Sequence, residues 1–253
     1  MRRVPAWRMA GDAVRSYGPM KPSMPATTAT PNPAANLFLP EGAALPTRLR
    51  VAWSALKVLE KDAGNTIAGP LLNACLDGGV YAELSQELVR TDAGRELLTE
   101  RPTLQASDID LQALARLPEG TLGHAFARYF EDNKISPFES PFEVRNDVDY
   151  LSKRYRETHD IAHVLTGYGT DIVGEMELQA FMLGNLGIRT AALILTFSTL
   201  RQIPREKGVS ARDYSRRLWA AYRRGARSQQ LIRVRYERYW ETPVQVLRDQ
   251  LCA

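Results

Sequence analysis

The distribution of proline constrains this chain most, because it separates two regions of different character. Eight of the fifteen prolines lie within residues 1–46, mixed with alanine and threonine. Proline at this density removes backbone donors and fixes φ, so neither a helix nor a sheet ladder can extend through the segment. We therefore expect a disordered, flexible N-terminal arm over residues 1–46 and one folded domain over residues 47–253.

The pattern of the folded region is helical. Apolar residues recur at spacings of three, four and seven, and no alternating run of β-branched residues is long enough for a sheet. The sequence therefore predicts an all-α fold. The clearest predicted helices cover Asp92–Glu100, about Asp147–Thr166, Asp171–Gly184 and 188–202, and the candidate N-caps are Thr47, Ser210 and Thr242.

Charge and composition narrow the choice of partners. The net charge is +4, and no motif of a nucleic-acid-binding module accompanies it, so we expect no nucleic acid. The longest apolar run of the second half, Ala191–Leu195, is far below the roughly 20 residues of a membrane-spanning helix. Residues 212–238 contain nine arginines and only two acidic residues, which gives this segment a local net charge of +7. Such a face suits an anionic membrane surface or an acidic partner, and a merely solvated face is the alternative. A homodimer is left open.

Two of the three histidines carry the strongest chemical signal. His159 and His163 stand four apart on one predicted helix, so their side chains lie one turn apart on the same face. Eleven residues, including a turn with two glycines, separate His163 from Glu175 in the first turns of the next helix. Two imidazoles and a carboxylate are the ligands of a catalytic zinc whose fourth position is left for water or substrate. The pattern predicts a site for Zn²⁺ or another divalent metal, and the alternative is that both histidines only pack inside a helical bundle.

Asp160 allows more than one role. It points about 100° away from His159 on the helix, so it reaches the metal from the side, orients a ligand, or carries protons. Two arginines precede it on the same helix: Arg154 could hold a substrate carboxylate in its planar fork, and Arg156 could pair with Asp160 four residues on. Both are candidate substrate-binding residues, and solvated arginines on a helix edge are the alternative.

The string from Arg154 to Gly167, with Glu175 beyond it, resembles the coenzyme Q (ubiquinone) biosynthesis family that is numbered fourth in the yeast series. The hallmark of that family is His-Asp-x-x-His, eleven residues, Glu. Further blocks agree in order, and the resemblance covers roughly residues 47–251. These blocks are Gly120–Gly123, Gly174-Glu175, Trp240–Pro243 and Leu247-Arg248.

This resemblance implies an all-α protein with a divalent metal, usually zinc, on His159, Asp160, His163 and Glu175. It implies peripheral association with the membrane where ubiquinone is assembled. We expect the cytoplasmic face of a bacterial inner membrane, with the matrix side of the mitochondrial inner membrane as the alternative. The partners implied are a polyprenylated aromatic quinone precursor and other ubiquinone-biosynthesis enzymes.

The activity implied is a metal-dependent lyase reaction, the oxidative removal of the C1 ring carboxylate of a polyprenylated hydroxybenzoate. In our hypothesis Asp160 or Glu157 exchanges the ring proton, and the prenyl tail lies against the helix at 188–202. The chain departs from the family pattern at Gln179, Phe181-Met182 and Gly187-Ile188.

Three other interpretations compete. In the first, the metal is structural and the protein is a non-catalytic scaffold that carries prenyl-quinone intermediates. Asp160 as a fourth protein ligand would favour this interpretation, because structural zinc sites are closed. In the second, His124 with Asp171 or Asp213 would complete a metal phosphohydrolase site. A metalloprotease is weaker still, because the general-base glutamate between the histidines is replaced by Asp160.

Overall fold

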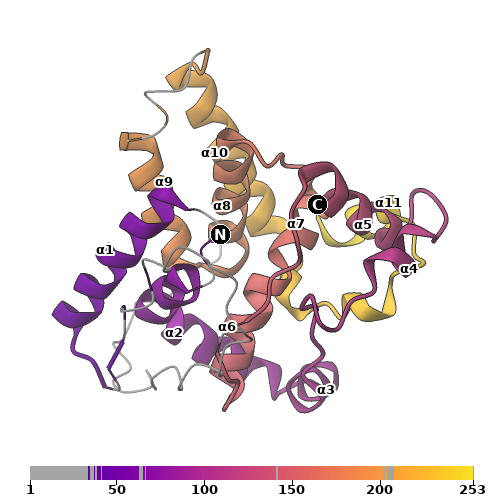
Figure 1. The fold of residues 1–253 in the computed structure, drawn as a ribbon, viewed down its shortest axis with the longest axis horizontal. Helices are drawn as coiled ribbons and strands as arrows, with labels where there is room; N and C mark the ends of the chain where they lie inside the picture. The colour runs from indigo at the N-terminus through magenta and orange to yellow at the C-terminus, as the bar shows by residue number, and fades with distance from the viewer. Residues whose placement is uncertain are drawn as a thin grey trace, which may run out of the picture.

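The computed structural model describes residues 42–252 except 63, 64, 66, 141, 202 and 204–207, together with residues 34, 37, 39 and 40. Within this part of the chain, eleven α-helices and no strand occur (Figure 1), which confirms the all-α prediction. The helices are α1 Leu45–Lys61, α2 Ala68–Leu88, α3 Asp92–Glu100, α4 Leu111–Ala115, α5 Leu122–Asn133, α6 Asp147–Glu157, α7 His159–Thr166, α8 Ile172–Leu186, α9 Arg189–Arg201, α10 Ala211–Arg227 and α11 Val244–Leu251.

The arrangement places the motif-bearing helices in the middle of the molecule. Figure 1 shows α1 and α9 on one side, α4, α5 and α11 on the other, and α6, α7 and α8 between them. The largest apolar cluster lies among these central helices and includes Leu151, Leu165 and Phe181. Most of the expected arm lies outside the described residues. Ala34 and Leu39 are nevertheless buried in a second cluster with α1 and α2, so packing begins before the predicted boundary at residue 47.

Helix starts agree with the sequence where a side chain caps the helix. Ser210 accepts a hydrogen bond from the Asp213 N–H at 3.5 Å and begins α10, as predicted. Two predicted caps are wrong: α1 begins at Leu45 with proline in its first turn, and α11 begins after Pro243. The earlier start of α1 agrees with Pro46, since proline is compatible with a first turn, where its missing N–H costs no hydrogen bond. In α11 the cap lies one residue later than predicted, on Pro243 itself.

The helix predicted over about Asp147–Thr166 is interrupted at Thr158, which divides it into α6 and α7. The buried Thr158 hydroxyl donates to the Arg154 carbonyl at 2.8 Å, a local bond that competes with regular helix geometry. His159 therefore stands in the first turn of α7.

Two glycines let α8 and α10 approach until their backbones touch. A Cβ atom on Gly184 would overlap the carbonyl oxygen of Tyr222, and one on Gly225 would overlap that of Phe181. Asn185 adds side-chain hydrogen bonds to the Gly225 and Gln229 carbonyls at 3.2 and 2.8 Å. This contact fixes α8, which carries Glu175, against the long basic helix.

The apolar helix predicted over 188–202 is α9, and it packs against three apolar clusters. Phe197 joins the cluster of α1 and α2, and Leu195 contacts the clusters on the other side. Leu200 near its end is 71% exposed, so α9 is only partly buried. No helix among the described residues combines the length and the apolar character that crossing a bilayer requires.

Candidate metal centre

A tight turn between α7 and α8 forms the site. Gly167 ends α7 in the left-handed region at φ 77°, a conformation that glycine adopts without strain. A Cβ atom on Gly174 would overlap the carbonyl oxygen of Gly169, so the start of α8 presses directly on the turn. Glycine at these positions therefore brings Glu175 opposite the histidine face of α7.

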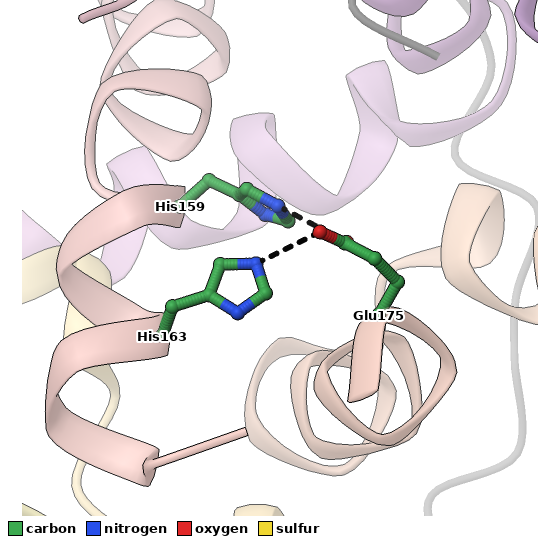
Figure 2. Close-up of side chains that lie close together, drawn as sticks. All are labelled: His159, His163 and Glu175. Atoms are coloured by element: carbon green, nitrogen blue, oxygen red, sulfur yellow. Dashed lines mark ion pairs between the residues drawn. The ribbon is translucent and has the colours of Figure 1, made fainter. Parts of the chain in front are cut away.

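Figure 2 shows the three side chains converging, with His159 and His163 on one helix and Glu175 on the facing one. His159 Nε2 lies 3.6 Å from Glu175 Oε2, and His163 Nε2 lies 3.2 Å from Glu175 Oε1. One ligand atom of each residue lies within 4.8 Å of the other two. Tetrahedral bonds of 2.0–2.1 Å would separate ligand atoms by about 3.3 Å, so both Glu175 contacts fit one zinc ion.

The hydrogen bonding of His163 supports a cation at this point. Its Nδ1 lies 3.0 Å from the Tyr168 carbonyl oxygen, which can only accept, so Nδ1 carries a proton and donates. The opposite atom, Nε2, is buried and makes no hydrogen bond, although it faces Glu175. In the neutral ring, Nε2 and the carboxylate are both acceptors. A metal ion or an additional proton must therefore lie between them.

In the absence of a metal, a proton takes that place. Burial opposes the charge on His163, but the contact with Glu175 and its negative charge raise the pKa of the ring overall. Burial likewise opposes the charge of Glu175, yet its contacts with His159 and His163 outweigh that effect and lower its pKa. Glu175 is thus an ionised ligand, and the metal competes with a proton on His163.

The site is open on one side. The His163 side chain is 1% exposed, whereas His159 is 18% and Glu175 34% exposed. Only these three residues form the cluster of potential metal ligands in the described part of the chain. Three protein ligands with solvent access leave a position for water or substrate, which is typical of catalytic rather than structural zinc.

Asp160 lies outside this three-residue cluster of the described residues, and its role as a fourth ligand stays a prediction. Asp160 Oδ1 instead lies 3.5 Å from the hydroxyl of Tyr129 on α5. The Tyr129 ring stacks on the His163 ring with centroids 5.6 Å apart. Sequence analysis missed Tyr129, because its position reads as an ordinary apolar face of α5.

Arg154 is a structural residue, which corrects its assignment to substrate binding. It is completely buried, and its five hydrogen bonds tie α6 to distant segments. The acceptors are the carbonyls of Pro102 (3.1 Å), Ile232 (3.2 Å) and Val234 (2.6 Å) and the two carboxylate oxygens of Glu237 (3.0 and 3.4 Å). No donor of the guanidinium is left for a ligand.

Glu157 is likewise outside the cluster of the described residues and is paired with another side chain, so its predicted catalytic role is not supported. Its carboxylate lies 2.7 Å from Lys153 Nζ, and both side chains are almost fully buried. Burial raises the pKa of Glu157, and the charge of Lys153 opposes that shift. Arg156, by contrast, makes no ion pair with Asp160 at four residues' distance. Burial raises the pKa of Asp160, and the positive charge of Arg156 is among those that oppose this shift.

Two further arginines that sequence analysis did not single out hold the last turn of α7. Arg224 of α10 donates to the Thr166 carbonyl at 2.8 Å, and Arg248 of α11 donates to the Val164 carbonyl at 2.8 Å. Arg224 also reaches the Cys252 carbonyl at 3.4 Å. These bonds satisfy carbonyls that a helix C-terminus leaves unpaired. The helix that carries both histidines is therefore fixed from two sides.

The residues of the phosphohydrolase alternative do not meet. His124 Nδ1 contacts the carbonyls of Ala115 and Leu117 at 3.2 and 3.1 Å. Asp171 caps α8, and Asp213 pairs with Arg216 at 2.9 Å on α10. None of the three belongs to the metal cluster of the described residues, so this interpretation is wrong.

Comparisons with known proteins identify relatives of this chain. The chain is 33% identical over 161 residues to the zebrafish (Danio rerio) protein "Ubiquinone biosynthesis protein COQ4 homolog, mitochondrial", covering 62% of this chain and 58% of the relative. The Homo sapiens homolog is 32% identical over 171 residues, covering 66% and 63%. Both matches span less than two thirds of the relative, whereas the Anopheles gambiae homolog, at 28% identity, is matched over 93% of this chain and 91% of its own length.

A solved structure shares the fold. The crystal structure of a chain from Nostoc punctiforme, described as a candidate ubiquinone biosynthesis protein, superposes with a TM-score of 0.65 at 27% identity. The match covers 81% of this chain and 96% of that one. The model of the family described as "Coenzyme Q (ubiquinone) biosynthesis protein Coq4" matches residues 54–252, which include both histidines, Glu175 and the helices that hold them. This chain belongs to the Coq4 family.

Proposed function

We propose that the protein acts in coenzyme Q biosynthesis, where it removes the C1 ring carboxylate of a polyprenylated hydroxybenzoate with a divalent metal on His159, His163 and Glu175. The observation that carries this proposal is the three-ligand cluster with one open side. Two histidines and one carboxylate suit Zn²⁺, and the same set serves non-haem Fe²⁺. The bound cation supplies Lewis acidity, which stabilises negative charge on an oxygen of the ring substrate.

The residues of the chain divide the remaining work. Asp160 and the Tyr129 hydroxyl, 3.5 Å apart, stand beside the cluster and exchange protons with the ring. In the simple reaction the ring–carboxylate bond breaks, carbon dioxide leaves, and a proton takes its place. In the oxidative form a hydroxyl takes its place, and one dioxygen and two reducing equivalents are consumed. Analysis of the product distinguishes the two forms.

The test compares histidines inside and outside the cluster. His163→Ala should lose the bound metal and the release of carbon dioxide from a prenylated hydroxybenzoate. His124→Ala should keep both, because His124 only contacts carbonyls of the α4 region. Equal carbon dioxide release by the two variants would remove the metal from the reaction. Metal-loaded wild type that binds the precursor without turning it over would leave the scaffold and carrier role instead.

The exposed face of α10 supports a peripheral membrane location. Most arginines between residues 212 and 238 are engaged, for example with Glu96 and Glu177, so the basic excess is smaller than the sequence predicted. The Trp219 ring is nonetheless 61% exposed and stacks on Tyr222 on the same helix. Indole rings favour the boundary between headgroups and acyl chains, and exposed arginines favour anionic lipids. The exposed arginines of α10 without a described ion pair are Arg212, Arg223 and Arg227.

The same location would serve assembly with other ubiquinone-biosynthesis enzymes at the membrane. The names of the relatives describe them as mitochondrial proteins, and we propose a mitochondrial location for this chain as well. This corresponds to the mitochondrial inner membrane on the matrix side, which is the alternative that the sequence left open.

A further inference from the structure

Tyr129 of α5 lies against the helix that carries both histidines. Its ring stacks on the His163 ring, with the centroids 5.6 Å apart and the planes inclined by 22°. The His159 ring meets the His163 ring at nearly a right angle, 85°, with the centroids 4.9 Å apart. Two ring contacts therefore fix the plane of the buried ligand, and one of them comes from a helix that supplies no ligand.

Hydrogen bonds to the turn between α7 and α8 hold Tyr129 in this position. Its carbonyl accepts from Asn133 Nδ2 at 2.8 Å, and Asn133 Oδ1 accepts from the Thr170 hydroxyl at 2.7 Å. Thr170 belongs to the turn that leads into α8. The end of α5 is therefore tied to the turn as well as to α7, which leaves the Tyr129 ring little freedom to move away.

The Tyr129 hydroxyl donates to Asp160 Oδ1 at 3.5 Å. No other side chain in the described part of the chain donates a hydrogen bond to this carboxylate. Burial raises the pKa of Tyr129, and the negative charges of Asp160 and Glu175 add to the shift, so the phenol keeps its proton. A neutral donor from a neighbouring helix thus holds the Asp160 carboxylate.

Asp160 lies near enough to the cluster to compete for a cation. It follows His159 directly and precedes His163 by three residues, so it stands one turn from the buried ligand along α7. The charges of both histidines and of Glu175 act on its carboxylate. Yet the cluster of potential ligands among the described residues contains only the other three. A carboxylate that turned to the metal would lose its hydrogen bond to Tyr129, which favours the observed arrangement.

We infer that Tyr129 is a positioning residue that keeps Asp160 off the metal and so leaves the fourth coordination position open. A carboxylate in that position would close the site with four protein ligands, the arrangement of a structural zinc. Held by Tyr129, Asp160 instead stays beside the site as a group that can exchange protons. The inference rests on the metal centre of the proposed function, but it does not depend on decarboxylation.

Metal binding to the purified protein tests this inference without turnover. The probes are Zn²⁺, measured by chelator competition, and Co²⁺, whose visible absorption reports the coordination of the ion. Tyr129→Phe keeps the stacked ring and removes only the hydroxyl. It should raise the affinity for zinc about three- to tenfold, because Asp160 no longer gives up a hydrogen bond to reach the metal.

An added anion measures the open position directly. Azide should change the Co²⁺ spectrum of wild type by occupying the fourth position. In Tyr129→Phe the same azide concentrations should change the spectrum less, because Asp160 competes for that position. A residue that merely packed against His163 would alter neither response when its ring is retained.

A second variant assigns the effect to Asp160. In the Asp160→Asn background, the change Tyr129→Phe should raise zinc affinity no further, because the competing carboxylate is gone. The comparison is made within each background, so the charge that Asp160→Asn removes near the cation cancels.

Tyr236→Phe is the matched control. Tyr236 is fully buried, and its hydroxyl donates to the Leu231 carbonyl at 3.0 Å. It lies outside the cluster of the described residues, so the loss of this hydroxyl should leave zinc affinity and the Co²⁺ spectrum unchanged. Thermal unfolding, measured for every variant, establishes that each protein is folded.

The outcomes separate this inference from the proposed function. Equal zinc affinity and azide response in Tyr129→Phe and wild type would overturn the role of Tyr129 and leave the metal centre standing. A gain that persists in the Asp160→Asn background would also overturn it, because Asp160 would not be the source. Equal zinc binding by wild type and His163→Ala would remove the metal centre and both proposals with it. A gain that requires Asp160 would support the inference, even if the metal-loaded protein released no carbon dioxide.

Discussion

Replacing Arg154 by glutamine is expected to lower the free energy of unfolding by about 3–5 kcal/mol, the usual cost of breaking a buried ion pair. The side chain is fully buried and makes three hydrogen bonds to carbonyls and two to Glu237. Hydrogen bonds of charged groups contribute about 1.5–3 kcal/mol each but are not additive, so their simple sum is an upper bound. Glu237 is 21% exposed, so water compensates part of its loss.

The assay is thermal unfolding of the metal-free protein. At about 2–4 °C per kcal/mol for a domain of this size, the melting temperature should fall by roughly 6–20 °C. Arg156→Gln is the matched control two residues on. It should shift the melting temperature by no more than about 4 °C, because Arg156 forms no ion pair with any residue that the structure describes. If the Arg154→Gln protein melts like wild type but binds a prenylated hydroxybenzoate weakly, Arg154 is not a structural residue and its assignment to substrate binding is restored.

Three other perturbations follow from the same contacts. Gly174→Ala should lower the free energy of unfolding by about 1–3 kcal/mol and weaken zinc binding, because its Cβ atom would overlap the carbonyl of Gly169. Calorimetric unfolding measures the first effect, and chelator competition measures the second. In the metal-free protein, the stability lost in His163→Gln should be largest between pH 4.5 and 6.5, where Glu175 is ionised and His163 protonated. This difference should shrink as the pH rises through the raised pKa of His163 or falls through the lowered pKa of Glu175, and urea titrations from pH 3 to 9 that show no such maximum would contradict the pairing. Trp219→Ala should weaken binding to anionic vesicles by about fivefold in a sedimentation assay, since about 1 kcal/mol of partial burial is lost, and unchanged binding would exclude α10 from the membrane contact.

The sequence predicted those features that local chemistry determines. The spacing of His159, His163 and Glu175 was sufficient to predict the cluster, because helix geometry and a glycine turn place them together. The helix at Asp92–Glu100 was predicted with its observed bounds, since proline follows it at once. The long helix α2, by contrast, shows no clear helical periodicity of apolar residues in the sequence. This helix is buried nearly all round, so its apolar residues mark no single face.

The errors concern tertiary partners. Arg154 and Arg156 look alike in the sequence. Arg154 nevertheless pairs with Glu237 from a segment far along the chain, whereas Arg156 forms no ion pair with any described residue. For Asp160 the sequence left several roles open and did not indicate that Tyr129 from another helix would lie 3.5 Å from its carboxylate. A single sequence contains no information on which distant segment will face a given side chain, so these roles became visible only in the fold.

The bonds from Arg224 and Arg248 to the last turn of α7 make metal capture depend on helices that follow every ligand in the sequence. A polypeptide acquires both histidines and Glu175 before it acquires α10 and α11, which hold α7 in place. Deletion of α11 would therefore keep all three ligands but release one side of the helix that carries both histidines, and we expect such a protein to hold the ion more weakly.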